Sequence, residues 1–112
     1  MKLITKEIER AFEKQGYTGE KTGDEIKIVC KLFNPIGAGT WYLYEKIDED
    51  VFMCFANLDD PQFAECGTVS LSELKRIFHP VFGLGIERDK HFEPLKHTLK
   101  EVINVVKSGG HI

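Results

Sequence analysis

Three stretches decide the fold of this chain: IKIVCKLF at 26–33, TWYLYEKI at 40–47 and VFMCFANL at 51–58. They are rich in β-branched and aromatic residues, which favour strands, and the first shows the two-residue alternation of a pleated strand. The third is apolar on both faces, which predicts that it is the central strand. Turn-forming Pro, Gly and Asp residues separate the stretches, so we expect antiparallel hairpins.

A fourth, shorter strand is predicted for ECGTVSL at 65–71. Ahead of the sheet, apolar residues recur at helical spacing over 3–15 and predict an amphipathic helix. Thr5 is placed to cap this helix, and Gly16 suits the left-handed residue that ends one.

Two capping boxes predict where the other helices begin. Ser70 is followed three residues later by Glu73, and Thr98 by Glu101, so each hydroxyl and carboxylate can satisfy backbone donors of a first helical turn. The first of these helices is expected to end at Pro80, and His79 would then lie at its C-terminus.

These elements predict a single small α+β domain over residues 1–108, with a flexible tail at 109–112. A mainly antiparallel meander of about four strands is packed by N-terminal, central and C-terminal helices. The sequence assigns no conformation to residues 81–94 and leaves the exact strand order open. If the stretch 26–33 is terminal in the sheet, its edge can pair two copies.

Composition excludes several classes of function. The net charge is −3 and there is no basic cluster beyond Lys75-Arg76, so nucleic-acid binding is not expected. The first residues carry charges where a signal peptide needs an apolar run, and no window is long and apolar enough for a membrane span. We expect a soluble, cytoplasmic protein.

The cysteines and histidines do not suggest a metal or redox site. Cys30, Cys54 and Cys66 are odd in number and form no Cys-x-x-Cys pair, which favours buried free thiols. The histidines lack the one-turn helical spacing of a metal pair. No cofactor and no metal are therefore expected.

Several runs occur in a fixed order that is similar to a known family: KLITKEIE, GTWYLYE, AECGTVSLSELKRI and GLGIERDKHFEP. Together they resemble the bacterial family called domain of unknown function 2958, from Lys2 to about Val102. The resemblance implies an accessory protein of plasmids, conjugative elements or phages. It implies no reaction.

The segment 86–94 holds the most polar candidate site. If the segment is extended, Glu87, Asp89, His91 and Glu93 project from one face, a set that can bind a divalent cation or act in acid–base chemistry. The alternative is a solvated edge strand with Phe92 in the core.

Arg88 projects from the opposite, more apolar face of that segment and needs a partner. We expect an ion pair with Glu45 or Glu65. The alternative is an anion site for a phosphate or carboxylate ligand.

Glu45 shares a face of its strand with Trp41 and Leu43. A three-residue turn at 48–50 would place it opposite Met53, where partial desolvation suits a general acid or base. The alternative is a strand-end glutamate that reaches water.

Three functions are compatible with these features. The preferred one is a non-catalytic binding module for an unidentified protein or small molecule, monomeric or weakly dimeric. The second is a small enzyme or ligand sensor, and the third is an inhibitor of host defence that acts by binding. The binding module would use Trp41, Tyr42, Tyr44 and the Arg88 segment, and the enzyme would use Glu45, Glu65, Asp89 and His91.

Overall fold

The computed structural model describes all 112 residues as an α+β domain with three helices and a five-stranded antiparallel sheet. The helices are α1 (Lys6–Gln15), α2 (Leu71–Arg76) and α3 (Leu99–Lys107), with a short 3-10 helix η1 (Pro61–Phe63). The strands are β1 (Cys30–Phe33), β2 (Thr40–Lys46), β3 (Val51–Asn57), β4 (Glu65–Ser70), β5 (Phe78–His79), β6 (Leu84–Gly85) and β7 (Glu87–Arg88).

The main sheet has the strand order β4-β3-β2-β1-β7. The predicted four-strand meander is confirmed, and β7 adds a fifth strand along the outer side of β1. Because of this fifth strand, β2 is the middle strand of the sheet. The strand predicted to be central, β3, is an interior strand between β4 and β2. The stretch 26–33 is not at the edge of the sheet, because β7 pairs with Leu32 and Phe33.

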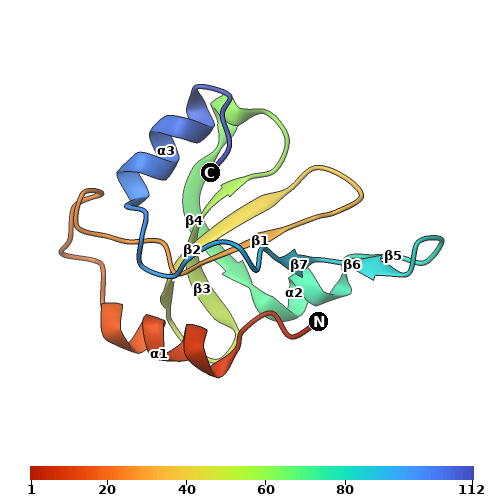
Figure 1. The fold of residues 1–112 in the computed structure, drawn as a ribbon, viewed down its shortest axis with the longest axis horizontal. Coiled ribbons are helices and arrows are strands. Elements are labelled where there is room, and N and C mark those ends of the chain that lie inside the picture. Colours follow the sequence, from red (N-terminus) through yellow and green to blue (C-terminus); the bar gives the residue numbers. More distant parts are fainter.

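Helices cover both faces of the sheet, which gives three layers (Figure 1). On one face α1 and α2 pack against the apolar side chains of a cluster that includes Trp41, Leu43 and Phe52. On the other face α3 packs against a second cluster that includes Tyr42 and Phe55. Neighbouring residues of β2 thus enter different clusters, as a pleated strand requires.

The first strand is shorter than predicted. Regular pairing with β2 begins at Cys30, whereas the preceding residues pair with the chain before α3. The Ile28 amide donates to the His97 carbonyl, and the Leu99 amide donates to the Ile26 carbonyl. These backbone bonds draw 26–28 toward α3, so the alternation of faces is interrupted at Val29 and Cys30, which both join the α1 side.

A β-bulge changes the predicted register of β2 and β3. Glu45 lies opposite Met53, as expected. Leu43 lies opposite Cys54 and Trp41 opposite Ala56, whereas a three-residue turn predicts Phe55 and Asn57 as their partners. The irregularity falls between Leu43 and Glu45. One extra residue on β2 shifts by one all the pairs that lie farther from the turn.

The predicted helix starts are confirmed by their caps. Thr5, Ser70 and Thr98 each accept a hydrogen bond from the backbone amide three residues on. The C-cap of α1 is Gly16, with φ 68°. At the start of α3, the carboxylate of the capping box makes a contact that was not predicted: Glu101 Oε1 lies 2.7 Å from His97 Nδ1.

The second helix ends earlier than predicted, at Arg76. Pro80 follows a strand, so His79 does not lie at a helix terminus. Its Nε2 atom is 3.1 Å from Asn34 Oδ1, which ties β5 to the hairpin between β1 and β2. The pair β5–β6 forms a two-stranded arm that projects from the domain (Figure 1).

The C-terminal residues make contacts with the domain. Ile112 packs against the α3-side cluster, and its carbonyl oxygen accepts a hydrogen bond from Lys31 Nζ at 2.8 Å. The flexibility expected for 109–112 remains a prediction. None of the helices has the length and apolar character of a membrane span.

Candidate binding site

The aromatic residues expected to form a contact surface are core residues. Trp41, Tyr42 and Tyr44 are only 7%, 3% and 4% exposed. They are buried because helices pack on both faces of β2, which the strand pattern alone does not show. These three side chains therefore belong to the core, and their direct contact with a ligand or partner remains a prediction.

Arg88 has neither of the carboxylate partners expected for it. Its guanidinium donates to the backbone carbonyls of Lys2 and Leu3, and its amide hydrogen points at the Met1 sulfur. The side chain thus fixes the segment before α1 against β7. The expected ion pair with Glu45 or Glu65 is wrong, since Glu45 lies on β2 and Glu65 on the far edge strand, β4.

Glu45 anchors a loop. Its Oε1 atom accepts hydrogen bonds from the backbone amide and the hydroxyl of Thr18, at 2.8 and 2.6 Å. Thr18 is 5% exposed, so this carboxylate satisfies donors that would otherwise be buried without a partner. The contact with Thr18 gives Glu45 a structural role.

The segment 86–94 is extended only over Glu87–Arg88 and then turns. Asp89 accepts a hydrogen bond from the His91 amide at 2.9 Å and lies 3.7 Å from Lys31 Nζ. Phe92 packs into the α3-side cluster beside Tyr42, as the edge-strand alternative predicted.

The predicted carboxylate row is broken by this turn. Glu93 leaves the row and lies 4.0 Å from Lys96 instead. No group of three or more His, Cys, Asp or Glu side chains is arranged to hold a metal ion. The proposed enzyme set is also divided, because Glu45, Glu65 and Asp89 come from β2, β4 and the end of β7.

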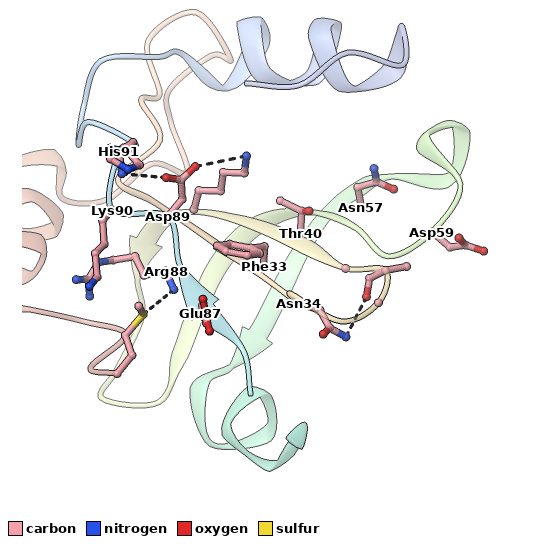
Figure 2. Close-up of a pocket in the computed structure, with 15 residues that line it drawn as sticks. Phe33, Asn34, Thr40, Asn57, Asp59, Glu87, Arg88, Asp89, Lys90 and His91 are labelled. Atoms are coloured by element: carbon pink, nitrogen blue, oxygen red, sulfur yellow. Dashed lines mark hydrogen bonds and ion pairs between the residues drawn. The ribbon is translucent and has the colours of Figure 1, made fainter. Parts of the chain in front are cut away.

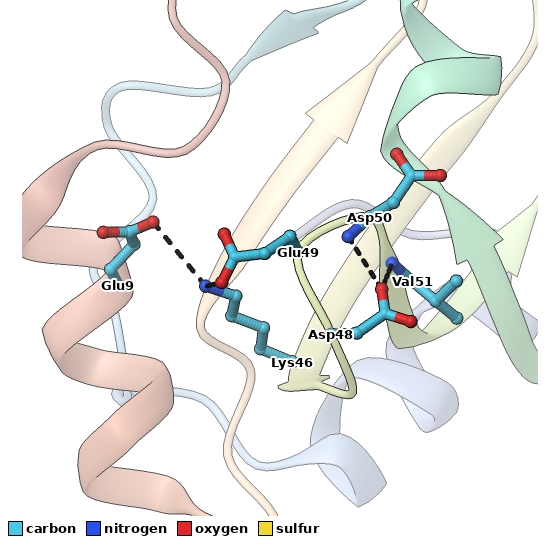
Figure 3. Close-up of polar contacts among 6 residues, drawn as sticks. All are labelled: Glu9, Lys46, Asp48, Glu49, Asp50 and Val51. Atoms are coloured by element: carbon cyan, nitrogen blue, oxygen red, sulfur yellow. Dashed lines mark hydrogen bonds and ion pairs between the residues drawn. The ribbon is translucent and has the colours of Figure 1, made fainter.

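The acidic turn between β2 and β3 is structural (Figure 3). Asp48 Oδ1 accepts hydrogen bonds from the amides of Asp50 and Val51, at 2.8 and 2.7 Å. Asp50 in turn accepts from Ser70 and Ser72, and these hydrogen bonds hold the pKa of its carboxyl below the usual range. Lys46 lies between Glu49 and Glu9, at 3.1 and 3.7 Å.

Two of the three cysteines are buried, as expected. Burial raises the pKa of Cys30 and of Cys54 to about 12, which keeps both thiols protonated and unreactive at neutral pH. Cys66 differs from the expectation, because it is exposed on the edge strand β4.

The main cavity lies where α3 leaves the sheet uncovered, between the β1–β2 hairpin, the end of β3 and the segment after β6 (Figure 2). Its volume is about 700 Å³. Four lining residues form one row across four strands, which we call the open row: Glu87, Phe33, Thr40 and Asn57. Each is directly opposite the next in the strand register, so all four side chains share one face.

The polar members of the open row have no protein partners. The Glu87 carboxylate and the Thr40 hydroxyl make no hydrogen bond or ion pair, although both residues are half-buried. The Asn57 Oδ1 atom is buried and also lacks a partner. Lys31 and Asp89 form the next row on the same face and neutralise each other.

Sequence reasoning named Glu87 in this row but missed Phe33, Thr40 and Asn57. Counting the residues of the hairpin at 34–39 could have paired Phe33 with Thr40. The pairing of Thr40 with Asn57 depends on the bulge in β2, and that of Phe33 with Glu87 depends on the pairing of β7 with β1, since the sequence left the strand order open.

Comparison of the sequence with known protein families identifies the family of this chain. The family described as Protein of unknown function (DUF2958) matches residues 3–112. The chain belongs to this family. The DUF2958 match confirms the resemblance seen in the sequence, and the description of the family names no activity. Searches of curated proteins and of solved structures give no match.

Proposed function

We propose that this DUF2958 protein is a non-catalytic protein-binding module. Its contact surface is the loop end, defined as the hairpin 34–39, the loop 58–63 and the arm formed by β5 and β6. One observation carries the proposal: this end exposes most of the large apolar side chains found at the surface. They are Ile36, Leu58, Phe63, Phe78, Val81 and Phe82, whereas only Met1, Tyr17 and Ile47 are exposed elsewhere.

The hairpin 34–39 links the other two parts of the loop end. The hydrogen bond between His79 and Asn34 joins the arm to the hairpin, and Gly39 and Asp59 line the same cavity from the hairpin and the loop. Exposed apolar groups that gather in one region mark interaction surfaces, and aromatic side chains are enriched in such interfaces. Val81 at the tip of the arm is 89% exposed.

The family resemblance supports a cellular setting for this binding. In an accessory protein of a plasmid, conjugative element or phage, the partner would be a cytoplasmic host protein. Inhibition of a host defence system is the consequence that such binding would have. Enzymatic function is less well supported, because Glu45 and Glu65 do not line the cavity that Asp89 and His91 line, and Glu45 and Asp89 are engaged in structural contacts.

The proposal is tested by site-specific photo-crosslinking in cells that produce the protein. A benzophenone amino acid replaces Val81 in one variant and the exposed Ile47 in a matched control. We expect a discrete adduct from position 81, absent from position 47, that is lost when Phe82 is changed to Ser. An adduct of twice the mass of the chain would identify a second copy as the partner. No adduct at 81, or the same adducts from both positions, would refute the loop end as the contact surface.

A further inference from the structure

The open row is a polar groove in the sheet with an aromatic floor. Neighbouring strands are about 4.8 Å apart, so the three steps from Glu87 to Asn57 cover roughly 14 Å. Phe33 and Thr40 lie between these ends. Figure 2 shows the four side chains on adjacent strands within the cavity. The row therefore has the length of an extended side chain together with the backbone that bears it.

The free groups of the cavity are mainly hydrogen-bond acceptors. Glu87 and Asp59 are unpaired carboxylates, and Asn57 has a buried oxygen without a donor. The Asn57 amide can turn about its terminal torsion to present this oxygen to a ligand.

The cations nearest the row are already engaged. Lys31 is paired with Asp89, and the Arg88 guanidinium is held by the carbonyls of the N-terminal segment. Lys90 and His91 are exposed and lie on the side of Asp89. A phosphate or carboxylate at the row would therefore meet the Glu87 carboxylate, and Lys90, the lysine of the cavity without an ion pair, follows Asp89 in the chain and is not in the row.

We propose that the open row binds an arginine side chain in an extended segment of the partner. The guanidinium lies on the ring of Phe33 and pairs with the Glu87 carboxylate, and a peptide N–H of the segment donates to Asn57 Oδ1. This inference rests on the proposed function, because the ligand is part of a protein. It adds the chemistry by which that partner is recognised.

Arginine fits the row better than lysine does. A guanidinium is planar, so it stacks on an aromatic ring while its fork of donors meets a carboxylate. An ammonium group has no plane to stack and is more strongly hydrated. The protein's net charge of −3 also favours a cationic ligand.

The test is a titration of the isotopically labelled full chain with the tripeptide acetyl-Gly-Arg-Gly-amide, followed by NMR. We expect saturable shifts of the backbone amides of Phe33, Thr40, Asn57 and Glu87. The same peptide with citrulline in place of arginine has nearly the same shape but no charge. We expect its Kd to be about tenfold weaker, because it loses a charge-assisted hydrogen bond.

Two variants complete the test. Glu87→Gln should weaken binding of the arginine peptide about tenfold, whereas Glu93→Gln, the same change outside the cavity, should leave it unchanged. Absence of saturable shifts, equal binding of the citrulline peptide, or unchanged binding by Glu87→Gln would each overturn the inference.

The two proposals can fail independently. Val81→Ser alters the loop end but not the open row, so it should retain the peptide titration. Peptide binding without a crosslink at position 81 would refute the loop end and leave the open row standing. A crosslink without peptide binding would refute only the arginine site.

Discussion

The two faces of the sheet differ in how completely helices cover them. On the α1 side, α1, α2 and the residues before α1 bury Trp41, Leu43 and Phe52. On the α3 side, α3 covers Tyr42 and Phe55, but the row that contains Phe33 is left open to the cavity. Polar groups without partners accumulate on the face that is only half covered. Coverage by helices therefore decides which part of a strand is scaffold and which part is free to bind.

The largest effect expected from this comparison concerns one phenylalanine on each face. Phe52 is 1% exposed and its ring centroid lies 5.2 Å from that of Phe12, so Phe52→Ala should leave a cavity. We expect it to lower the free energy of unfolding by about 3–5 kcal/mol. Phe33→Ala, at the open row, should cost about 1 kcal/mol because the ring is already partly in contact with water. Urea denaturation measures both, and equal losses would contradict the comparison.

An intermediate effect is expected where a carboxylate anchors a loop on the covered side. Glu45→Ala removes the acceptor for the buried amide and hydroxyl of Thr18. We expect a loss of about 2–3 kcal/mol in the free energy of unfolding, because two donors lose their partner. Glu93→Ala, at a solvent-exposed carboxylate, should change stability by less than about 0.5 kcal/mol. A Glu45→Ala protein as stable as the parent would show that the contact does not hold the loop.

The smallest effect on stability is expected in the open row itself. Asn57→Ala removes a buried oxygen that has no donor, so the cost of lost packing is offset by the relief of an unsatisfied group. We expect the free energy of unfolding to change by less than about 1 kcal/mol, in the stabilising direction. The same substitution should weaken binding of the arginine peptide. A loss of stability of about 2 kcal/mol or more, measured by thermal and urea unfolding, would instead show that Asn57 stabilises the fold. The loss of a buried hydrogen bond typically costs about 1–3 kcal/mol.

Local sequence signals predicted most of the elements. The caps at Thr5, Ser70 and Thr98 marked the helix starts, because a side-chain oxygen acting on nearby amides needs no distant contact. One prediction failed where a distant segment competes for the backbone, and another failed at a β-bulge. Pairing of 26–28 with the chain before α3 shortened the first strand, and an extra residue in β2 shifted its register.

The candidate site was less accessible to sequence reasoning. Glu87, Asp89 and His91 were recognised as polar candidates near one another, and all three line the cavity. The acidic partners proposed for Arg88 were wrong, because backbone carbonyls of the first residues reach its guanidinium across 85 or more positions of sequence. A carbonyl acceptor leaves no signature in a sequence, since every residue has one.

The sequence by itself determined the class of fold, the meander of β1 to β4, the helix starts and membership of the family, because strand periodicity, turns and caps are local properties of the chain. Only the tertiary structure decided that Trp41, Tyr42 and Tyr44 are core and that the open row is not. The physical reason is that burial depends on which helix lies over each end of a strand. That placement depends on contacts between residues far apart in the chain, such as those joining 26–28 to the residues before α3 and Arg88 to the N-terminal segment.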